Sequence, residues 1–164
     1  MSDLKLFDDA VLQAIRDKLL KSKKTVAVAE SVTSGLLQFA FSNTMDTIEF
    51  FEGGITAYNP NQKFRLLNVE PKHALEVNCV SEKVAFELAS NARNKFSSDY
   101  GIGVTGYASE VPESDYKLFA YFSIVDKERE IAAAKMVAEP SEGIGVQLHY
   151  VSEILREFRD ALNA

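Results

Sequence analysis

Ser31 is the hydroxyl whose place in the sequence best suits a nucleophile. It follows residues 25–29 (TVAVA), a run of β-branched and small side chains typical of a buried strand. A serine at the turn after such a strand can present its oxygen at the edge of a sheet. Serine is also a common helix cap or turn residue. Position alone therefore leaves both interpretations of Ser31 open, with the turn residue the more common case.

A nucleophilic serine also needs a base to accept its proton. The sequence offers two histidines: His73 falls in a short predicted helix, and His149 falls inside a predicted amphipathic helix. Neither position suits a partner for Ser31. A lysine can act instead when burial lowers its pKa toward neutrality. Asn59 caps free N–H groups and the next residue, a proline, fits a first turn, which places Lys63 one turn into a helix.

Composition excludes several other classes of function. The formal net charge of −6 argues against a nucleic-acid partner, which needs a clustered basic surface. Cys79 is the single cysteine, so neither an internal disulfide nor a cysteine metal cage is predicted, and no metal site is expected from two histidines without a matching motif. No segment approaches the roughly 20 apolar residues of a membrane span. We therefore expect a cytoplasmic protein without a membrane partner.

The spacing of apolar residues predicts the elements that would position Ser31 and Lys63. Helices are expected at about 8–21, 35–41, after Asn59, around His73, at 82–96 and across 148–162, and strands at 25–29, 53–58, 101–105, 117–125 and 130–138. This order predicts a single-domain α/β protein over 1–164, a three-layer α/β/α sandwich with a mixed sheet. Ligands in such sheets bind beyond the carboxyl ends of strands, where Ser31 and Thr105 would both lie.

Five segments, taken in order, resemble a known family. They are AESVTSGLL at 29–37, FEGGITAYN at 51–59, LLNV at 66–69 after Lys63, VSEKVA at 80–85 and DYGIGVTG at 99–106. The pattern is similar to that of the CinA C-terminal domain family, which includes stand-alone nicotinamide mononucleotide deamidases. The resemblance covers most of the chain from about residue 25 to residue 106.

The resemblance implies a reaction and a set of site residues. The reaction is hydrolysis of the carboxamide of nicotinamide mononucleotide to nicotinate mononucleotide and ammonia, with neither a metal nor an organic cofactor. The implied roles are catalytic for Ser31, Lys63 and Tyr58, and substrate-binding for Glu30, Thr33, Thr105 and Gly106. We expect a small pyridine nucleotide or related amide as the partner, and a homo-oligomer.

The chain departs from the family pattern at three places, one of which is the family's arginine before the last helix, where this chain has Gly143, Ile144 and Gly145. The family usually reads AESCTGG where this chain has Val32 and Ser34, and a glycine-rich GPGGGT-like loop follows the family's VTG where this chain has YASEVPESD. That segment carries Glu110, Glu113 and Asp115. Because like charges repel, the loop predicts weak binding of a phosphate group.

A second function is also open from the sequence. A catalytically degenerate paralogue would keep the fold and bind a small ligand or a protein partner through the same cleft, without turnover. The two alternatives differ in whether ammonia is released from a bound carboxamide.

Overall fold

The computed structural model describes residues 5–164. Its centre is a five-stranded sheet in the order β2-β1-β3-β4-β5. The strands are β1 (Val26–Glu30), β2 (Phe51–Thr56), β3 (Tyr100–Gly106), β4 (Phe119–Val125) and β5 (Glu130–Val137). β1 runs parallel to β2 and β3, whereas β4 and β5 continue the sheet in antiparallel register. The sheet is therefore mixed, as the sequence predicts.

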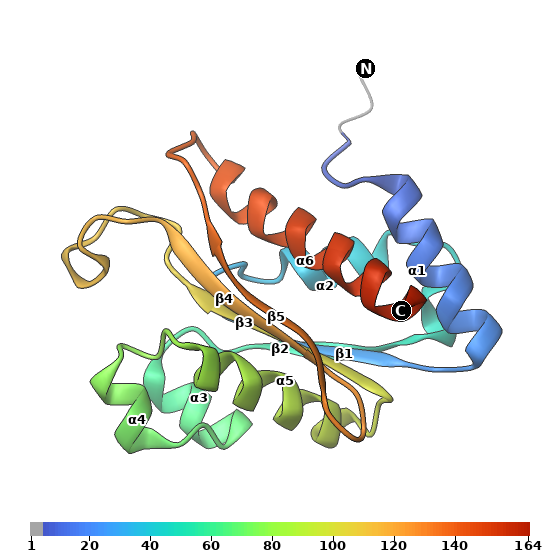
Figure 1. Ribbon diagram of the computed structural model, residues 1–164, viewed down its shortest axis with the longest axis horizontal. Helices are drawn as coiled ribbons and strands as arrows, with labels where there is room; N and C mark the ends of the chain where they lie inside the picture. The colour runs from blue at the N-terminus through green and yellow to red at the C-terminus, as the bar shows by residue number, and fades with distance from the viewer. Residues whose placement is uncertain (1–4) are drawn as a thin grey trace.

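Helices cover both faces of the sheet (Figure 1). One face carries α1 (Asp9–Ser22), α2 (Leu36–Ser42) and α6 (Gly145–Asn163), and the other carries α3 (Pro60–Leu67), α4 (Pro71–Glu76) and α5 (Glu82–Phe96). Short 3-10 turns occupy Thr47–Glu49 and Pro112–Ser114. The predicted three-layer α/β/α sandwich is confirmed. In residues 5–164, no helix combines the length and the apolar character that crossing a membrane requires.

The helices begin at capping residues that the sequence supplies. The Asp8 carboxylate accepts the N–H of Ala10 at 3.0 Å at the start of α1. The Asn59 side chain accepts the N–H of Gln62 at 3.0 Å at the start of α3. Such bonds satisfy donors that have no partner inside the helix. The cap at Asn59 fixes where α3 begins and hence where Lys63 lies.

Two apolar clusters hold the layers together. The larger one lies between the sheet and α1, α2 and α6, where Phe41 and Phe158 meet edge to face with ring centroids 6.4 Å apart. The smaller one lies under α3, α4 and α5 and contains Leu67, Val84 and Leu88. Burial of such side chains supplies the main free energy of folding.

The glycines of β3 let α5 lie directly on the sheet. A Cβ atom at Gly101 would lie 2.1 Å from the carbonyl oxygen of Ala89, and one at Gly103 would lie 2.4 Å from that of Ala85. Residues 101–106 have the G-x-G-x-x-G spacing of a dinucleotide-binding turn, but they lie within a strand instead of between a strand and a helix. Gly101 and Gly103 serve helix packing here, whereas a Cβ atom at Gly106 would meet Ala120 of β4.

β2 lies two residues earlier in the chain than the sequence predicts. The expected strand at 53–58 is found at Phe51–Thr56. The ladder with β1 ends where the Ala57 N–H donates to the Glu30 carbonyl at 2.9 Å, and the Asn59 cap begins α3 two residues later. Tyr58 therefore lies in a turn, not in a strand.

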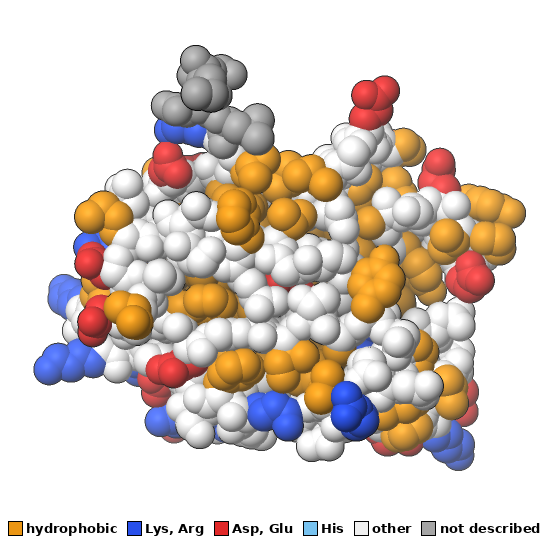
Figure 2. Space-filling model, turned by 180° about the vertical axis from the view of Figure 1, so that it is seen from behind, with side chains coloured by type: hydrophobic (Ala, Val, Ile, Leu, Met, Phe, Trp, Pro, Cys, Tyr) orange, Lys and Arg blue, Asp and Glu red, His pale blue; other side chains and the backbone are white. Residues whose placement is uncertain are grey.

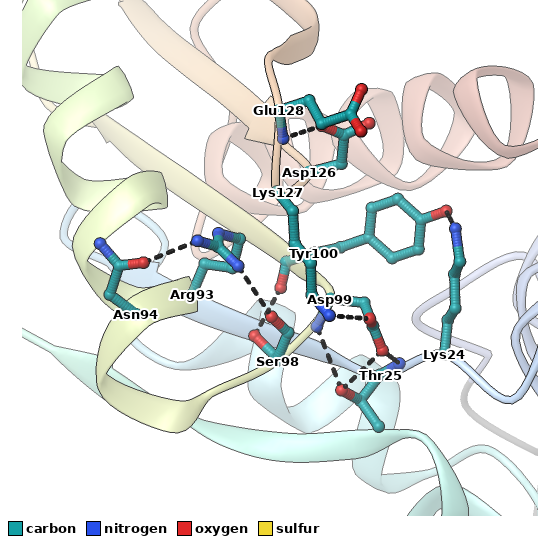
Figure 3. A network of polar contacts seen from close by, with 10 residues as sticks. All are labelled: Lys24, Thr25, Arg93, Asn94, Ser98, Asp99, Tyr100, Asp126, Lys127 and Glu128. Carbon is teal, nitrogen blue, oxygen red and sulfur yellow. Dashed lines mark hydrogen bonds and ion pairs between the residues drawn. The ribbon is translucent and has the colours of Figure 1, made fainter.

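A polar network closes the amino ends of β1 and β3 (Figure 3). The Asp99 carboxylate accepts the N–H of Thr25 at 3.0 Å and pairs with Lys127 at 3.2 Å, while the Asp99 N–H donates to the Thr25 hydroxyl at 3.2 Å. Burial pushes the pKa of Asp99 upward, but the Thr25 N–H and Lys127 outweigh it and lower that pKa. This network joins the starts of two strands with the β4–β5 turn.

Candidate active site

A pocket of about 300 Å³ opens at the carboxyl ends of β1 and β3. It is lined by Ser31, Val32, Tyr58, Pro60, Lys63, Asn78, Cys79, Val80, Thr105, Gly106, Tyr107, Ala108, Ser109 and Val111. The structure thus brings together residues from three separate parts of the sequence: Ser31, the pair Tyr58 and Lys63, and the pair Thr105 and Gly106. It does so at the sheet edge where open α/β sheets bind ligands.

Lys63 is a buried amine that reaches this pocket from α3. Its residue is 3% exposed, and its Nζ donates to the carbonyl oxygen of Tyr58 at 3.3 Å. Burial lowers the pKa of Lys63 because it disfavours the charged form, and the neighbouring Cys79 offsets this effect only in part. A lysine in this state carries a larger neutral fraction at physiological pH than an exposed one and can accept a proton.

Ser31 follows directly on β1 and is 7% exposed in the pocket wall. The chain turns sharply after it, since the Ser34 N–H donates to the Ser31 carbonyl at 3.1 Å. Ser34 and Gly35 then take positive φ angles of 50° and 96°. Glycine tolerates such angles without steric cost. The turn lets α2 start beside the strand and leaves the Ser31 side chain facing the pocket.

Glu30 and Thr33 support this turn and do not line the pocket. Both residues are fully buried, and the Glu30 carboxylate accepts the Thr33 hydroxyl at 2.6 Å. The same carboxylate accepts the main-chain N–H groups of Leu37 at 2.8 Å and Gln38 at 3.0 Å. Their polar atoms hold α2 against β1. The substrate-binding role that the resemblance implies for the two residues stays a prediction.

Tyr58 lies at the rim of the pocket, with 72% of its surface exposed. The contact that it makes with Lys63 uses its main-chain carbonyl. The catalytic role that the resemblance implies for Tyr58 stays a prediction. Tyr58 is at the mouth because β2 ends before it and α3 starts after it, so its side chain has no strand face to pack on.

Thr105 and Cys79 form the back of the pocket. The Thr105 hydroxyl donates to the Cys79 carbonyl at 2.6 Å, so it fixes the 78–80 turn to the end of β3. Asn78 and Cys79 both have positive φ angles, 51° and 60°. Cys79 is buried and also lines the pocket near Lys63. Burial raises the pKa of its thiol.

The last helix fixes two walls of the pocket, which the sequence does not reveal. The amide of Gln147 donates to the carbonyl of Val32 at 2.9 Å, and the hydroxyl of Tyr150 donates to the carbonyl of Tyr107 at 2.8 Å. The two donors lie three residues apart, on one face of α6. They hold the β1–α2 turn and the loop after β3 at a fixed distance from each other.

The acidic side chains of the loop after β3 do not line the pocket, although Glu113 is close enough to the lining residue Tyr107 that burial and this carboxylate together raise the pKa of the Tyr107 phenol. Ser109 and Val111 line the wall, whereas Glu110 borders a second hollow beside β5 and Asp115 pairs with Lys117 at 3.4 Å. Among the lining residues within 5–164, Lys63 is the sole Lys or Arg. The expected direct repulsion of a phosphate by these acids is thereby weakened, but the pocket still lacks a second cation for an anionic ligand.

Seen from the side opposite to Figure 1, charged side chains gather toward the margins of the molecule (Figure 2). The middle of this face consists mainly of uncharged polar and apolar groups. A strong positive field that would collect anionic ligands is not apparent on it.

Known proteins share the sequence pattern and the fold of this chain. The family model of the CinA C-terminal domain matches residues 8–160. The chain therefore belongs to the CinA C-terminal domain family. Relatives include a competence-damage inducible protein of Natranaerobius thermophilus, 38% identical over 109 residues, which are 66% of this chain and 26% of that protein. A protein of the same name from Streptococcus pneumoniae is 37% identical over 101 residues, 62% of this chain and 24% of the relative.

The chain thus matches about a quarter of the length of these curated relatives. Solved structures agree on the fold. A competence or damage-inducible protein from Enterobacter asburiae has a TM-score of 0.87 at 24% identity, covering 94% of this chain and 97% of that one. A CinA superfamily protein from Enterobacter cloacae has a TM-score of 0.88 at 21% identity, covering 99% and 96%.

Proposed function

We propose that this protein is an amidohydrolase that cleaves the carboxamide of nicotinamide mononucleotide or a closely related pyridine amide, with Ser31 as nucleophile and Lys63 as base. The observation that carries the proposal is the buried amine of Lys63 in a pocket that Ser31 also lines. Serine with a lysine of lowered pKa is a known means of activating a hydroxyl without histidine. Family membership supports the same assignment.

The reaction proceeds in two halves. Ser31 Oγ attacks the carboxamide carbon while neutral Lys63 takes the hydroxyl proton, so a C–O bond forms and the carbonyl electron pair moves to oxygen. Main-chain N–H groups of the turn after Ser31 stabilise this oxyanion. Lys63 then gives its proton to the amide nitrogen, the C–N bond breaks, and ammonia leaves. Water attacks the acyl-serine by the same route and releases the carboxylic acid.

The pocket suits the amide and ring of this substrate better than its phosphate. Val32, Val80, Ala108 and Val111 give it an apolar wall of the kind that receives a planar ring. Lys63 has to be neutral to act as the base, so it does not hold the phosphate at the same moment. We therefore expect the unphosphorylated nicotinamide riboside to bind no worse than the mononucleotide.

An ammonia-release assay on the mononucleotide and on the riboside tests the proposal. We expect release by the unaltered protein, and its loss in Ser31→Ala with an unchanged circular dichroism spectrum and melting temperature. Ser42→Ala is the matched control, because Ser42 is an exposed residue of α2 outside the pocket, and it should retain activity. Full activity of Ser31→Ala would refute the nucleophile. Binding of either compound without ammonia release would favour the degenerate paralogue.

A further inference from the structure

Tyr107 is an aromatic lining residue of the pocket that the proposed mechanism does not use. It follows the end of β3 directly, and the loop that it begins extends beyond the sheet (Figure 1). Its N–H donates to the Phe119 carbonyl at 2.8 Å, and its carbonyl accepts the Tyr150 hydroxyl at 2.8 Å. Because both main-chain groups are bonded, the point from which the side chain starts is fixed relative to β4 and α6.

The Tyr107 ring stands between Phe119 and the pocket. The two rings meet edge to face, with centroids 5.3 Å apart and an interplanar angle of 68°. Phe119 lines the second hollow beside β5 and not the pocket, whereas Tyr107 lines the pocket and not that hollow. Phe119 thus supports the ring from behind, and the opposite side of the ring is left to the pocket.

The phenol end of Tyr107 reaches the turn between α4 and α5, which also lines the pocket. Burial raises the pKa of the phenol, and the Asn78 side chain opposes this rise as a hydrogen-bond partner. Asn78 and Cys79 belong to that turn, and both line the pocket. The ring therefore extends from the loop after β3 to the turn and forms a side wall of the pocket.

The charges around this wall suit a cation better than an anion. Within residues 5–164, Lys63 is the sole Lys or Arg that lines the pocket, and burial disfavours its charged form. The exposed carboxylate of Glu113 is near enough to the Tyr107 phenol to raise its pKa further. The face of an aromatic ring also carries partial negative charge and attracts a cation within about 6 Å. A positively charged ring beside Tyr107 therefore meets attraction from both groups.

We propose that Tyr107 reads the positive charge of the ligand's ring, so that the pocket takes N-substituted pyridinium carboxamides in preference to neutral aromatic amides. The inference rests on the proposed function for the carboxamide end of the ligand and adds the charge of the ring as a second requirement. A pyridinium carries its charge within the ring, so it is attracted where it lies against the tyrosine. A neutral ring of the same shape gains the apolar contact alone.

Two compounds of the same shape test the charge by itself. Nicotinamide methylated on its ring nitrogen and meta-methylbenzamide both carry a methyl group meta to a carboxamide, and the first alone has a cationic ring. Calorimetric titration of Ser31→Ala, which lacks the proposed nucleophile, should show the cation binding about tenfold more tightly. Adding Tyr107→Leu should reduce this ratio to about twofold or less, whereas adding Tyr107→Phe should keep it, because the ring is retained.

Tyr116→Leu is the matched control, added to the same Ser31→Ala protein. Tyr116 belongs to the same loop, is 61% exposed and does not line the pocket, so its replacement should leave the ratio unchanged. Circular dichroism spectra should show that each variant is folded. The proposal is overturned by equal binding of the two compounds to Ser31→Ala, by a ratio that Tyr107→Leu leaves unchanged, or by an equal loss of the ratio in Tyr116→Leu.

The titration separates this inference from the proposed function, because it needs no turnover. If the unaltered protein releases no ammonia but the binding ratio depends on Tyr107, the amidohydrolase proposal fails and the preference for a cationic ring stands. If ammonia is released and the two compounds bind equally, the inference about Tyr107 fails alone.

Discussion

Charged groups at the two ends of the central sheet lie in opposite environments, one rich in hydrogen-bond partners and one poor in them. At the amino ends of β1 and β3, the Asp99 carboxylate has an N–H partner, a hydroxyl partner and Lys127. At the carboxyl ends, the Lys63 amine is buried with one hydrogen bond, at 3.3 Å, to a carbonyl. The first arrangement stabilises the charged form of its group, and the second disfavours it. The comparison distinguishes a site built for stability from one suited to proton transfer.

Removing the amine of Lys63 should have the largest effect on ammonia release, and so tests the difference between the two ends of the sheet most strongly. Lys63→Met keeps a long side chain in the buried position but cannot accept a proton. We expect ammonia release to fall by about 10²–10⁴-fold, and the melting temperature to hold or rise, because burial disfavours the charged amine. If the variant unfolds at a lower temperature and keeps its activity, then Lys63 stabilises the fold and is not the base.

Removing one hydrogen bond from α6 should have the next largest effect. Tyr150→Phe keeps the ring but deprives the Tyr107 carbonyl of its donor, at a cost of about 1–3 kcal/mol in stability. Because that carbonyl belongs to a pocket wall, kcat should fall more than KM changes. Phe158→Leu, in the same helix but in the core away from the pocket, is the control and should lower stability without a specific loss of kcat.

A change at the opposite end of the sheet should separate stability from activity. Asp99→Asn should cost about 1 kcal/mol of unfolding free energy and leave ammonia release per folded molecule unchanged. The folded-state pKa of Asp99 is depressed below its ordinary value of 3.8, so its contribution is present above that pH and is lost as the pH falls through the folded pKa. Denaturation at pH 7 and below pH 3 should show the difference between variants shrinking in acid. A difference that grows in acid would contradict this account.

Neutralising the loop after β3 should have the smallest effect. With Glu110→Gln, Glu113→Gln and Asp115→Asn combined, calorimetric titration should show mononucleotide binding improved only a few-fold, because these acids act on the pocket from outside it. The riboside has no phosphate and carries the positive charge of its pyridinium ring, so its binding should not improve and serves as the control. If the unaltered protein binds the mononucleotide in the low-micromolar range, and clearly better than the riboside, then other groups hold the phosphate.

Much of this molecule follows from local sequence signals. The Asn59-Pro60 start of α3, the stripe of α5 and the strand before Ser31 are each fixed by neighbouring residues, and each is found where the sequence predicts it. The grouping of Ser31 with Thr105 follows from the rule that ligands bind beyond strand ends, and that of Ser31 with Lys63 from the resemblance to the family.

Other features depend on contacts between distant segments. The burial of Glu30 is decided by how α2 returns to β1. The contact of Tyr150 with Tyr107 joins residues 43 positions apart. Cys79 lies in the pocket because Thr105 binds its carbonyl. Such contacts cannot be predicted from a local pattern of residue types. An amphipathic helix or an apolar strand has the same pattern whether or not one of its side chains bonds to a distant segment.

The central claim is that Lys63 is a buried amine poised to lose its proton, and its titration tests this most directly. Nuclear magnetic resonance of the protein with isotope-labelled lysine side chains, with the Lys63 signal assigned by its absence from Lys63→Met, gives its pKa without reference to any substrate. We predict a value clearly below the ordinary 10.5, with kcat/KM rising as the pH increases through it, because the neutral amine is the base. A Lys63 signal that titrates at or above 10.5 would contradict the account.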